Sequence, residues 1–321
     1  MLDVTRLRVL VAVSRHGSVT AAARALNYAQ PSVSHHLARL EAETGAALTQ
    51  RAGRGLRLTD AGRLLAERAE EILGRLDAAE NELAAHVGLR AGRIRLAAFP
   101  SALSTIVPAA AARLEAEYPG MDLTLAEAEP PEAAHMLRAG YVDVALVFRH
   151  CQDGIAAGPP ADEDAGTRSR LLLDDPIYLV TRSGAEPPLP KRPSLADYAQ
   201  QRWIGGCERC RRYLIWQCEL AGFTPRIAFT TDDFVAVQAL VAAGLGITTL
   251  PGLALRAARH PGIQAAALPG SHRQVLAVTY GQGPEPPAVA RLLDVLSQSS
   301  GTEPARSSGS RPASTARADG A

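Results

Sequence analysis

Three of the four cysteines lie close together in the sequence, at Cys207, Cys210 and Cys218. Paired thiols can be oxidised to a disulfide or can hold a metal ion, and the arginines around this cluster would favour the reactive thiolate form. A second cysteine pair with the spacing of a zinc site is absent, which leaves Cys151 as the one further candidate ligand. Structural thiols, redox-active thiols and a metal site all stay open, and the sequence assigns no metal ligand.

A second group of reactive side chains lies near the N-terminus and has the chemistry needed to contact DNA. Gln can form a bidentate pair with adenine, while Ser, His and Arg suit phosphates or base edges. Residues 1–60 carry eight arginines against four acidic residues, although the whole chain has a net charge of only +1. A solvated helix face and a solvated turn are the alternative interpretations. The candidate DNA contacts are Gln30, Pro31, Ser32, Ser34, His35, Arg39, Arg51 and Arg54.

Three short helices are expected to position these side chains. Ser18 can cap the second helix, and Asn27 begins a tight turn before the third. The third helix carries an apolar stripe at Val33, Leu37 and Leu40, and its candidate DNA contacts lie off that stripe. Two short extended pieces follow, and the turn over residues 51–55 joins them. The pattern is that of a helix-turn-helix with a basic rim.

A long helix is predicted from Thr59 to about Gly88. Its apolar residues recur at spacings of 4 and 3, the a/d pattern of a coiled coil, and charged residues fill the positions between them. This pattern favours a dimerisation helix, although an amphipathic helix packed on its own domain would show a similar stripe. The predicted dimer contacts are Leu65, Ile72, Leu76 and Leu83.

The remainder of the chain alternates strand and helix patterns. With 321 residues, of which 47% are hydrophobic, the chain can form two or three domains. Strand, helix, strand, helix and strand follow one another over residues 92–150, which predicts a parallel sheet covered by helices. A second α/β unit runs from about Leu171 to Ala266, and a last strand (Val275–Tyr280) and helix (Pro287–Ser297) return to the first unit.

The stretch from Gly17 to Gly62 resembles the winged helix-turn-helix signature of the LysR-type transcriptional regulators. A weaker resemblance continues over most of the remaining chain, through Pro108, Tyr118-Pro119, Leu137, Gly140, Asp143 and residues 240–251. Three positions depart from the family pattern: Ala29 replaces a capping Ser or Thr, His35 replaces a common Arg, and Thr49 replaces an aromatic residue. The N-terminal matches are the Ala-Ala and Ala-Leu run before the turn, Gln30-Pro31, Ser34, Leu40-Glu41, Gly45, Leu48, Arg51 and Leu58-Thr59.

The resemblance implies an α/β protein with three parts. These are a mainly α winged helix-turn-helix DNA-binding domain (residues 2–59), a linker and dimerisation helix (60–89) and an effector-binding domain (92–298) like a periplasmic binding protein. Within the last part, subdomain I comprises residues 92–163 and 268–298, and subdomain II comprises residues 168–267. Residues 299–321 are rich in Ser, Gly, Pro, Ala and Arg and are expected to be disordered.

The resemblance also implies a function: a transcription regulator that a small-molecule effector controls. The expected partners are double-stranded promoter DNA, an unidentified effector and further copies of the chain in a homodimer or homotetramer, with RNA polymerase as a further candidate. Effector clefts of this fold lie at strand ends and helix N-termini. By resemblance, the cleft residues are Phe99, Pro100, Ser101, Glu129, Gly205, Cys207, Thr230 and Asp232, each of which could instead be a cap or loop residue.

Several other classes of protein are not favoured. The only lysine, Lys191, follows a proline rather than a P-loop glycine, no Gly-x-Ser-x-Gly elbow occurs, and no cofactor motif is found. No secretion signal or apolar run of membrane-spanning length is visible, so a cytoplasmic protein with reduced thiols is expected. Two alternatives remain: an α/β ligand-binding protein or enzyme whose N-terminal helices merely dimerise, and a regulator that responds to thiol oxidation.

Overall fold

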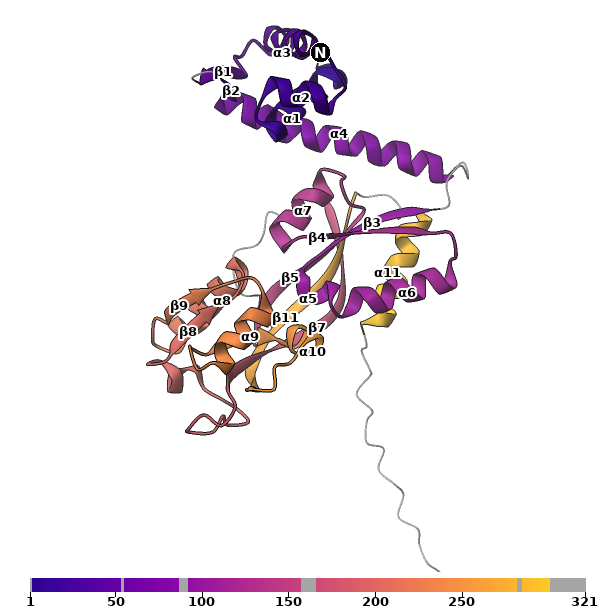
Figure 1. The fold of residues 1–321 in the computed structure, drawn as a ribbon. Coiled ribbons are helices and arrows are strands. Elements are labelled where there is room, and N and C mark those ends of the chain that lie inside the picture. Colours follow the sequence, from indigo (N-terminus) through magenta and orange to yellow (C-terminus); the bar gives the residue numbers. More distant parts are fainter. Residues whose placement is uncertain (1, 53–54, 87–91, 157–165, 282–284, 301–321) are drawn as a thin grey trace, which may run out of the picture.

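The computed structural model describes residues 2–52, 55–86, 92–156, 166–281 and 285–300. A small helical domain, the long helix α4 and an α/β domain follow one another along the chain (Figure 1). Arg54, which was predicted to contact DNA, and residues 301–321 of the predicted disordered tail lie outside the described residues. The first two residues of that tail are ordered instead, because Ser299 ends the last helix and Ser300 is its buried C-cap. Within those residues, no helix is both long enough and apolar enough to span a lipid bilayer.

The N-terminal domain packs three helices around a small apolar core, and its turns are set by individual polar residues. The Ser18 hydroxyl accepts a hydrogen bond from the backbone N–H of Ala21 and so caps the second helix. Asn27 has a positive φ of 55° in the turn before the third helix. The elements are α1 (Val4–His16), α2 (Val19–Ala25), α3 (Gln30–Thr44), β1 (Thr49–Ala52) and β2 (Gly55–Leu58).

One carboxylate joins α3 to the β1–β2 hairpin, the wing. Glu41 Oε1 accepts hydrogen bonds from the backbone N–H of Leu48 at 2.9 Å and from both the backbone N–H and the hydroxyl of Thr49, at 2.9 and 3.0 Å. Thr49, which stands where an aromatic residue was expected, therefore supplies a donor to this joint. Because α3 and the wing share this carboxylate, their relative position is fixed by charge-assisted hydrogen bonds.

Helix α4 (Asp60–His86) has one apolar face that is buried and another that is exposed. Ala66, Ala69 and Leu73 are buried in the core of the N-terminal domain, and Leu65 packs partly buried against the same core. Ile72, Leu76 and Leu83 are instead 45%, 38% and 65% exposed. Of the four predicted dimer contacts, Leu65 thus packs within its own domain, while the other three form an uncovered stripe.

The α/β domain is built on one seven-stranded sheet in the order β10-β7-β11-β5-β3-β4, with β6 beside β5. Strands β3, β4 and β5 are parallel, whereas β11 is antiparallel to β5 and β7. A second, two-stranded sheet pairs β8 with β9. The strands are β3 (Arg93–Ala98), β4 (Asp122–Glu127), β5 (Val144–Gln152), β6 (Ile155–Ala156), β7 (Thr167–Arg182), β8 (Arg202–Gly205), β9 (Arg226–Thr230), β10 (Thr248–Pro251) and β11 (Ile263–Tyr280).

The two long strands β7 and β11 differ from the elements expected from the sequence. The sequence pattern placed the last strand at Val275–Tyr280, but β11 begins at Ile263 and pairs with β7 along most of its length. The pairing shifts register between Ala267 and His272, where Pro269 and Gly270 interrupt the alternation. This bulge explains why the sequence pattern showed only the C-terminal part of the strand. Strand β11 crosses the predicted subdomain boundary at residue 268, and β7 pairs with it on both sides of this bulge.

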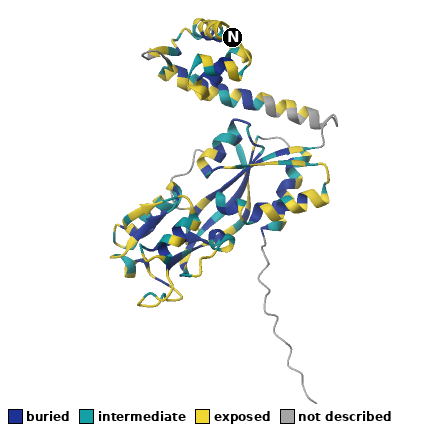
Figure 2. Ribbon diagram, in the orientation of Figure 1, coloured by how far each residue is buried: buried dark blue, intermediate teal, exposed yellow. Residues whose placement is uncertain are grey.

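Helices cover both faces of the main sheet, and buried residues line its strands (Figure 2). Helices α5, α6 and α11 share the largest buried cluster with β3, β5 and β11. Helix α7 packs over the opposite face, and α8 and α9 belong to separate clusters around β7 and β8. The helices are α5 (Pro100–Leu103), α6 (Ile106–Glu117), α7 (Pro130–Arg138), the 3-10 helix η2 (Leu195–Tyr198), α8 (Glu208–Leu220), α9 (Phe234–Ala242), α10 (Gly252–Ala257) and α11 (Pro287–Ser299).

Helix α4 also contacts the α/β domain at the end of α7. A Cβ atom on Gly74 would overlap the backbone carbonyl of Ala139, so only glycine permits this approach. Beside it, Arg75 donates a hydrogen bond to the carbonyl of Leu137 at 3.0 Å and stacks over the ring of Tyr280 at 3.3 Å. The linker helix is thus docked on subdomain I through its own backbone.

We predict that Gly74→Ala separates α4 from α7 without unfolding either domain. Alanine favours the helix by about 1 kcal/mol over glycine, so α4 itself should be stabilised while its docking is blocked. Amide hydrogen exchange at residues 137–141 should accelerate in this variant and stay unchanged in Ala79→Ser, at an exposed position of the same helix. Equal exchange in Gly74→Ala and the wild-type protein would show that the docked arrangement is not maintained in solution.

Candidate DNA-binding and effector sites

The side chains predicted to contact DNA project from one face of α3. Gln30, Pro31, Ser32, Ser34, His35 and Arg39 are all exposed, whereas Val33, Leu37 and Leu40 are buried. Gln30 donates a hydrogen bond to Ser34 Oγ at 3.1 Å within the first turn. Ala29 provides no side-chain cap, and Pro31 occupies the first turn, where its missing N–H is tolerated. In the wing, Arg51 is exposed at the end of the hairpin.

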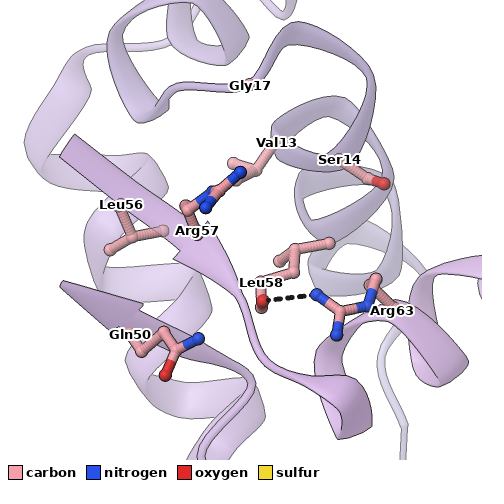
Figure 3. A pocket seen from close by; sticks show the side chains of 8 residues that line it. All are labelled: Val13, Ser14, Gly17, Gln50, Leu56, Arg57, Leu58 and Arg63. Atoms are coloured by element: carbon pink, nitrogen blue, oxygen red, sulfur yellow. Dashed lines mark hydrogen bonds between the residues drawn. The ribbon is translucent and has the colours of Figure 1, made fainter. Parts of the chain in front are cut away.

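An open hollow of about 410 Å³ lies between α1 and the wing (Figure 3). Arg57 and Gln50 face each other across the hairpin and line it together with Val13. Arg63 of α4 donates a hydrogen bond to the carbonyl of Leu58 at 3.0 Å and pairs with Asp60. Arg63 is therefore already engaged in joining the wing to α4, which leaves Gln50 and Arg57 as the polar groups of the hairpin that the hollow presents.

A small cavity of about 50 Å³ lies in the α/β domain. Because a water molecule needs roughly 10–15 Å³ of such space, the cavity holds only a few water-sized molecules. Six of the predicted effector residues line it: Phe99, Pro100, Ser101, Glu129, Cys207 and Asp232. The other two, Gly205 and Thr230, end their strands next to it, and the following residues, Gly206 and Thr231, line the cavity in their place.

A buried ion pair holds Arg273 in the wall of the cavity and was not anticipated from the sequence. Arg273 Nε donates to Asp175 Oδ2 at 2.8 Å, and its Nη2 donates to Ser101 Oγ at 2.8 Å. Both charged residues are almost fully buried, and the guanidinium also lies over the rings of Phe99 and Phe148. Burial raises the pKa of Asp175, although Arg273 opposes this effect. The signal for Arg273 was hidden because it lies within β11, whose extent the sequence pattern did not show.

Glu129 ends the loop before α7 with its carboxyl group turned into the cavity. Its Oε2 is buried and has no hydrogen-bond partner among the described residues. Burial, followed by the nearby charge of Cys210, raises the pKa of Glu129 to about 7. The carboxyl group therefore changes its charge near neutral pH.

Cys207 and Cys210 meet at the start of α8, where Cys207 is the N-cap residue. The Cys207 thiol donates a hydrogen bond to Cys210 Sγ at 3.0 Å. This bond, together with His150 and Arg273, holds the pKa of Cys210 well below its usual value, while the same contact and burial raise the pKa of Cys207. Cys151 and Cys218 are buried elsewhere. Across the described residues, no cluster of three or more His, Cys, Asp or Glu side chains is arranged to hold a metal.

The comparisons with known proteins agree with this architecture. The profile described as "Bacterial regulatory helix-turn-helix protein, lysR family" matches residues 4–63, and that described as "LysR substrate binding domain" matches residues 88–300. YvbU of Bacillus subtilis, an uncharacterized HTH-type transcriptional regulator, is 33% identical over 79% of this chain and 83% of its own. LrrA of Synechococcus elongatus, a probable HTH-type transcriptional regulator, is 28% identical over 92% of this chain and 97% of its own.

The same fold occurs in solved structures. The crystal structure of CbnR, a LysR family transcriptional regulator, has a TM-score of 0.65 with 22% sequence identity and covers 94% of this chain and all of its own. The chain therefore belongs to the LysR family of bacterial transcriptional regulators. It is a DNA-binding transcription regulator with an N-terminal helix-turn-helix domain and a C-terminal effector-binding domain.

The raised pKa of Glu129 predicts a pH dependence of stability. A buried carboxyl group whose folded-state pKa lies above its unfolded value of 4.5 binds more protons in the folded protein, so folding weakens as the pH rises from about 4.5 to about 7. Relative to Glu129→Gln, which cannot ionise, the wild-type protein should lose stability across this window. Urea midpoints measured from pH 4.5 to 8 would check this, with Glu132→Gln, an exposed residue in α7, as the control. A constant difference between Glu129→Gln and the wild-type protein would contradict the shifted pKa.

Proposed function

We propose that the regulator reads promoter DNA with the exposed face of α3 and uses the wing to hold the phosphate backbone. The observation that carries this proposal is the division of α3 into a buried apolar stripe and a face of exposed Gln, Ser, His and Arg side chains. A structurally similar protein, full-length CbnR, has been solved in complex with its target DNA; it is 23% identical to this chain, with a TM-score of 0.64. Side chains from the start of such a helix reach base edges in the major groove.

Replacement of residues in α3 and the wing tests this proposal. Gln30→Ala should weaken binding to the operator by about 1–3 kcal/mol, because a base contact is lost, and should have little effect on unrelated DNA. Arg51→Ala should weaken binding to all sequences and reduce the salt slope by about one, because a phosphate contact is lost. Fluorescence anisotropy over a range of salt concentrations would measure both. Glu115→Ala, exposed on α6, is the control, and binding by both variants at the wild-type level would place the DNA surface elsewhere.

The exposed stripe of α4 supports assembly of the regulator from copies of the same chain. Ile72, Leu76 and Leu83 recur on a heptad pattern and remain uncovered in one chain, whereas Leu65 serves its own domain. We infer that the stripe pairs with the same helix of a second chain, which would place two α3 helices on two half-sites. Whether two such dimers form a tetramer depends on surfaces of the effector domain.

Ile72→Asp tests the role of the stripe. A carboxylate at an apolar dimer contact is costly when it is unpaired, so dissociation of the dimer should increase, and binding to a two-half-site operator should fall with it. Light scattering at several protein concentrations would measure the mass. The control is Glu67→Ala on the exposed polar face of α4. A variant with the wild-type mass would exclude this stripe as the dimer contact.

The cavity of the α/β domain is the proposed site of signal reception, and the regulator is proposed to act by binding rather than as an enzyme. Its lining combines the aromatic rings of Phe99 and Phe148 with the polar groups of Ser101, Glu129 and Arg273. Because it is far smaller than the roughly 300–1,000 Å³ of pockets for drug-sized ligands, a larger effector would require the subdomains to open. We propose that the protein acts in the cytoplasm, where promoter DNA is found, with RNA polymerase as a further candidate partner.

A further inference from the structure

Two thiols and three ionisable side chains gather in and beside the effector cavity. Cys207 and Cys210 both line it, with their sulfur atoms 3.0 Å apart. Glu129 and Arg273 line the same cavity. His150 of β5 lies beside Cys210, is buried and stacks on Tyr213.

The surroundings divide the two thiols into different roles. Cys210 receives the hydrogen bond of Cys207 and lies near the positive charge of Arg273, so its thiolate form is stabilised. Cys207 is the hydrogen-bond donor and keeps its proton. Cys210 is therefore the nucleophile, and Cys207 is the neighbour placed to react with whatever Cys210 becomes.

The cavity as it stands has room for a very small reactant. Its space of about 50 Å³ corresponds to a few water-sized molecules. A hydroperoxide as small as hydrogen peroxide fits this space and is the chemical class that oxidises thiolates. We propose that Cys207 and Cys210 form a dithiol that small hydroperoxides oxidise inside the effector cavity, and that the resulting disulfide is a signal that changes DNA binding. The signalling part of this inference rests on the proposed function.

The reaction balances in two steps. The Cys210 thiolate attacks one oxygen of hydrogen peroxide; an S–O bond forms, the O–O bond breaks, and the departing hydroxide takes a proton and leaves as water. Glu129, whose pKa is about 7, lies in the cavity as a source of that proton. Cys207 sulfur then attacks the sulfenic sulfur of Cys210, the S–O bond breaks, and the hydroxide leaves with the Cys207 proton. Two thiols and one peroxide give one disulfide and two water molecules.

The disulfide is within reach of the existing geometry. The two sulfur atoms must approach by only about 1 Å to reach the bond length of a disulfide. Bond formation removes the negative charge of Cys210 from beside Arg273, whose guanidinium also holds Asp175 of β7 and Ser101 of α5. Oxidation therefore changes the charge beside Arg273, which lies in β11 and is paired with Asp175 of β7. Through these two strands, the change of charge could alter how the subdomains are positioned relative to each other.

The thiol chemistry is tested on the reduced, full-length protein in the absence of DNA. After treatment with equimolar hydrogen peroxide, remaining thiols are alkylated under denaturing conditions and mapped by mass spectrometry. Trypsin cuts after Arg209, so the expected disulfide appears as two linked peptides containing Cys207 and Cys210, while Cys151 and Cys218 are alkylated. Because a free cysteine is only a few per cent thiolate at pH 7, Cys210 should react roughly ten-fold faster than free cysteine.

Single substitutions distinguish the two roles. In Cys207→Ser, which retains a hydrogen-bond donor, a sulfenic acid should accumulate on Cys210 and be trapped by dimedone. In Cys210→Ser, Cys207 should remain unlabelled. Circular dichroism checks that each variant is folded, and Cys207→Ala replaces the serine variant if it is not. Dimedone on Cys207, a disulfide that includes Cys151 or Cys218, or oxidation slower than that of free cysteine would overturn the proposal.

The signalling role is tested separately by operator binding of the reduced and peroxide-treated proteins. Wild-type affinity should change at least five-fold on oxidation and be restored by dithiothreitol, whereas Cys210→Ser should show no change. A complete disulfide with unchanged operator affinity would overturn the signalling role. Absence of operator binding in both redox states would instead count against the proposed function and leave the thiol map standing, so the two failures are distinguishable.

Discussion

The arrangement of the effector domain depends on the buried ion pair between Arg273 and Asp175. A pair of charges removed from water is stabilised only when further hydrogen bonds satisfy the remaining donors and acceptors. Here Asp175 Oδ1 accepts the backbone N–H of Leu253 at the start of α10, and Arg273 also donates to Ser101 in α5. One ion pair thus fixes two helices relative to the paired strands β7 and β11. Removal of either charge would leave the other buried and unpaired.

In the N-terminal half, helix α4 contacts two domains with different sides. Its buried residues complete the core of the DNA-binding domain, and Gly74 brings its backbone against α7. The apolar residues Ile72 and Leu76 are left outside both contacts. Because one rigid helix contacts the DNA-binding domain on one side and the effector domain on another, a shift of either domain on α4 would change how the two are related.

The sequence predicted the elements better than it predicted their contacts. Helix periodicity and turn residues such as Ser18 and Asn27 act locally, so the sequence predicted the cap of α2 and, to within one residue, the start of α4. The partners of Glu41, Gly74 and Arg273 lie far away in the chain or on other elements, and no local pattern reports them. The bulge at Pro269 and Gly270 hid the length of β11, and with it the position of Arg273 beside the cavity.

The charges of the cavity also bear on what it can bind. Several helices begin at its wall, and their N-terminal N–H groups favour an anion there. The structure places two anionic groups of the protein near these helix N-termini. The Asp175 carboxylate is paired with Arg273, and Cys210 lies near the same guanidinium group. An incoming anion would have to compete with both. A neutral reactant meets no such competition, and its oxidation of Cys210 would remove one of the negative charges that the site already holds.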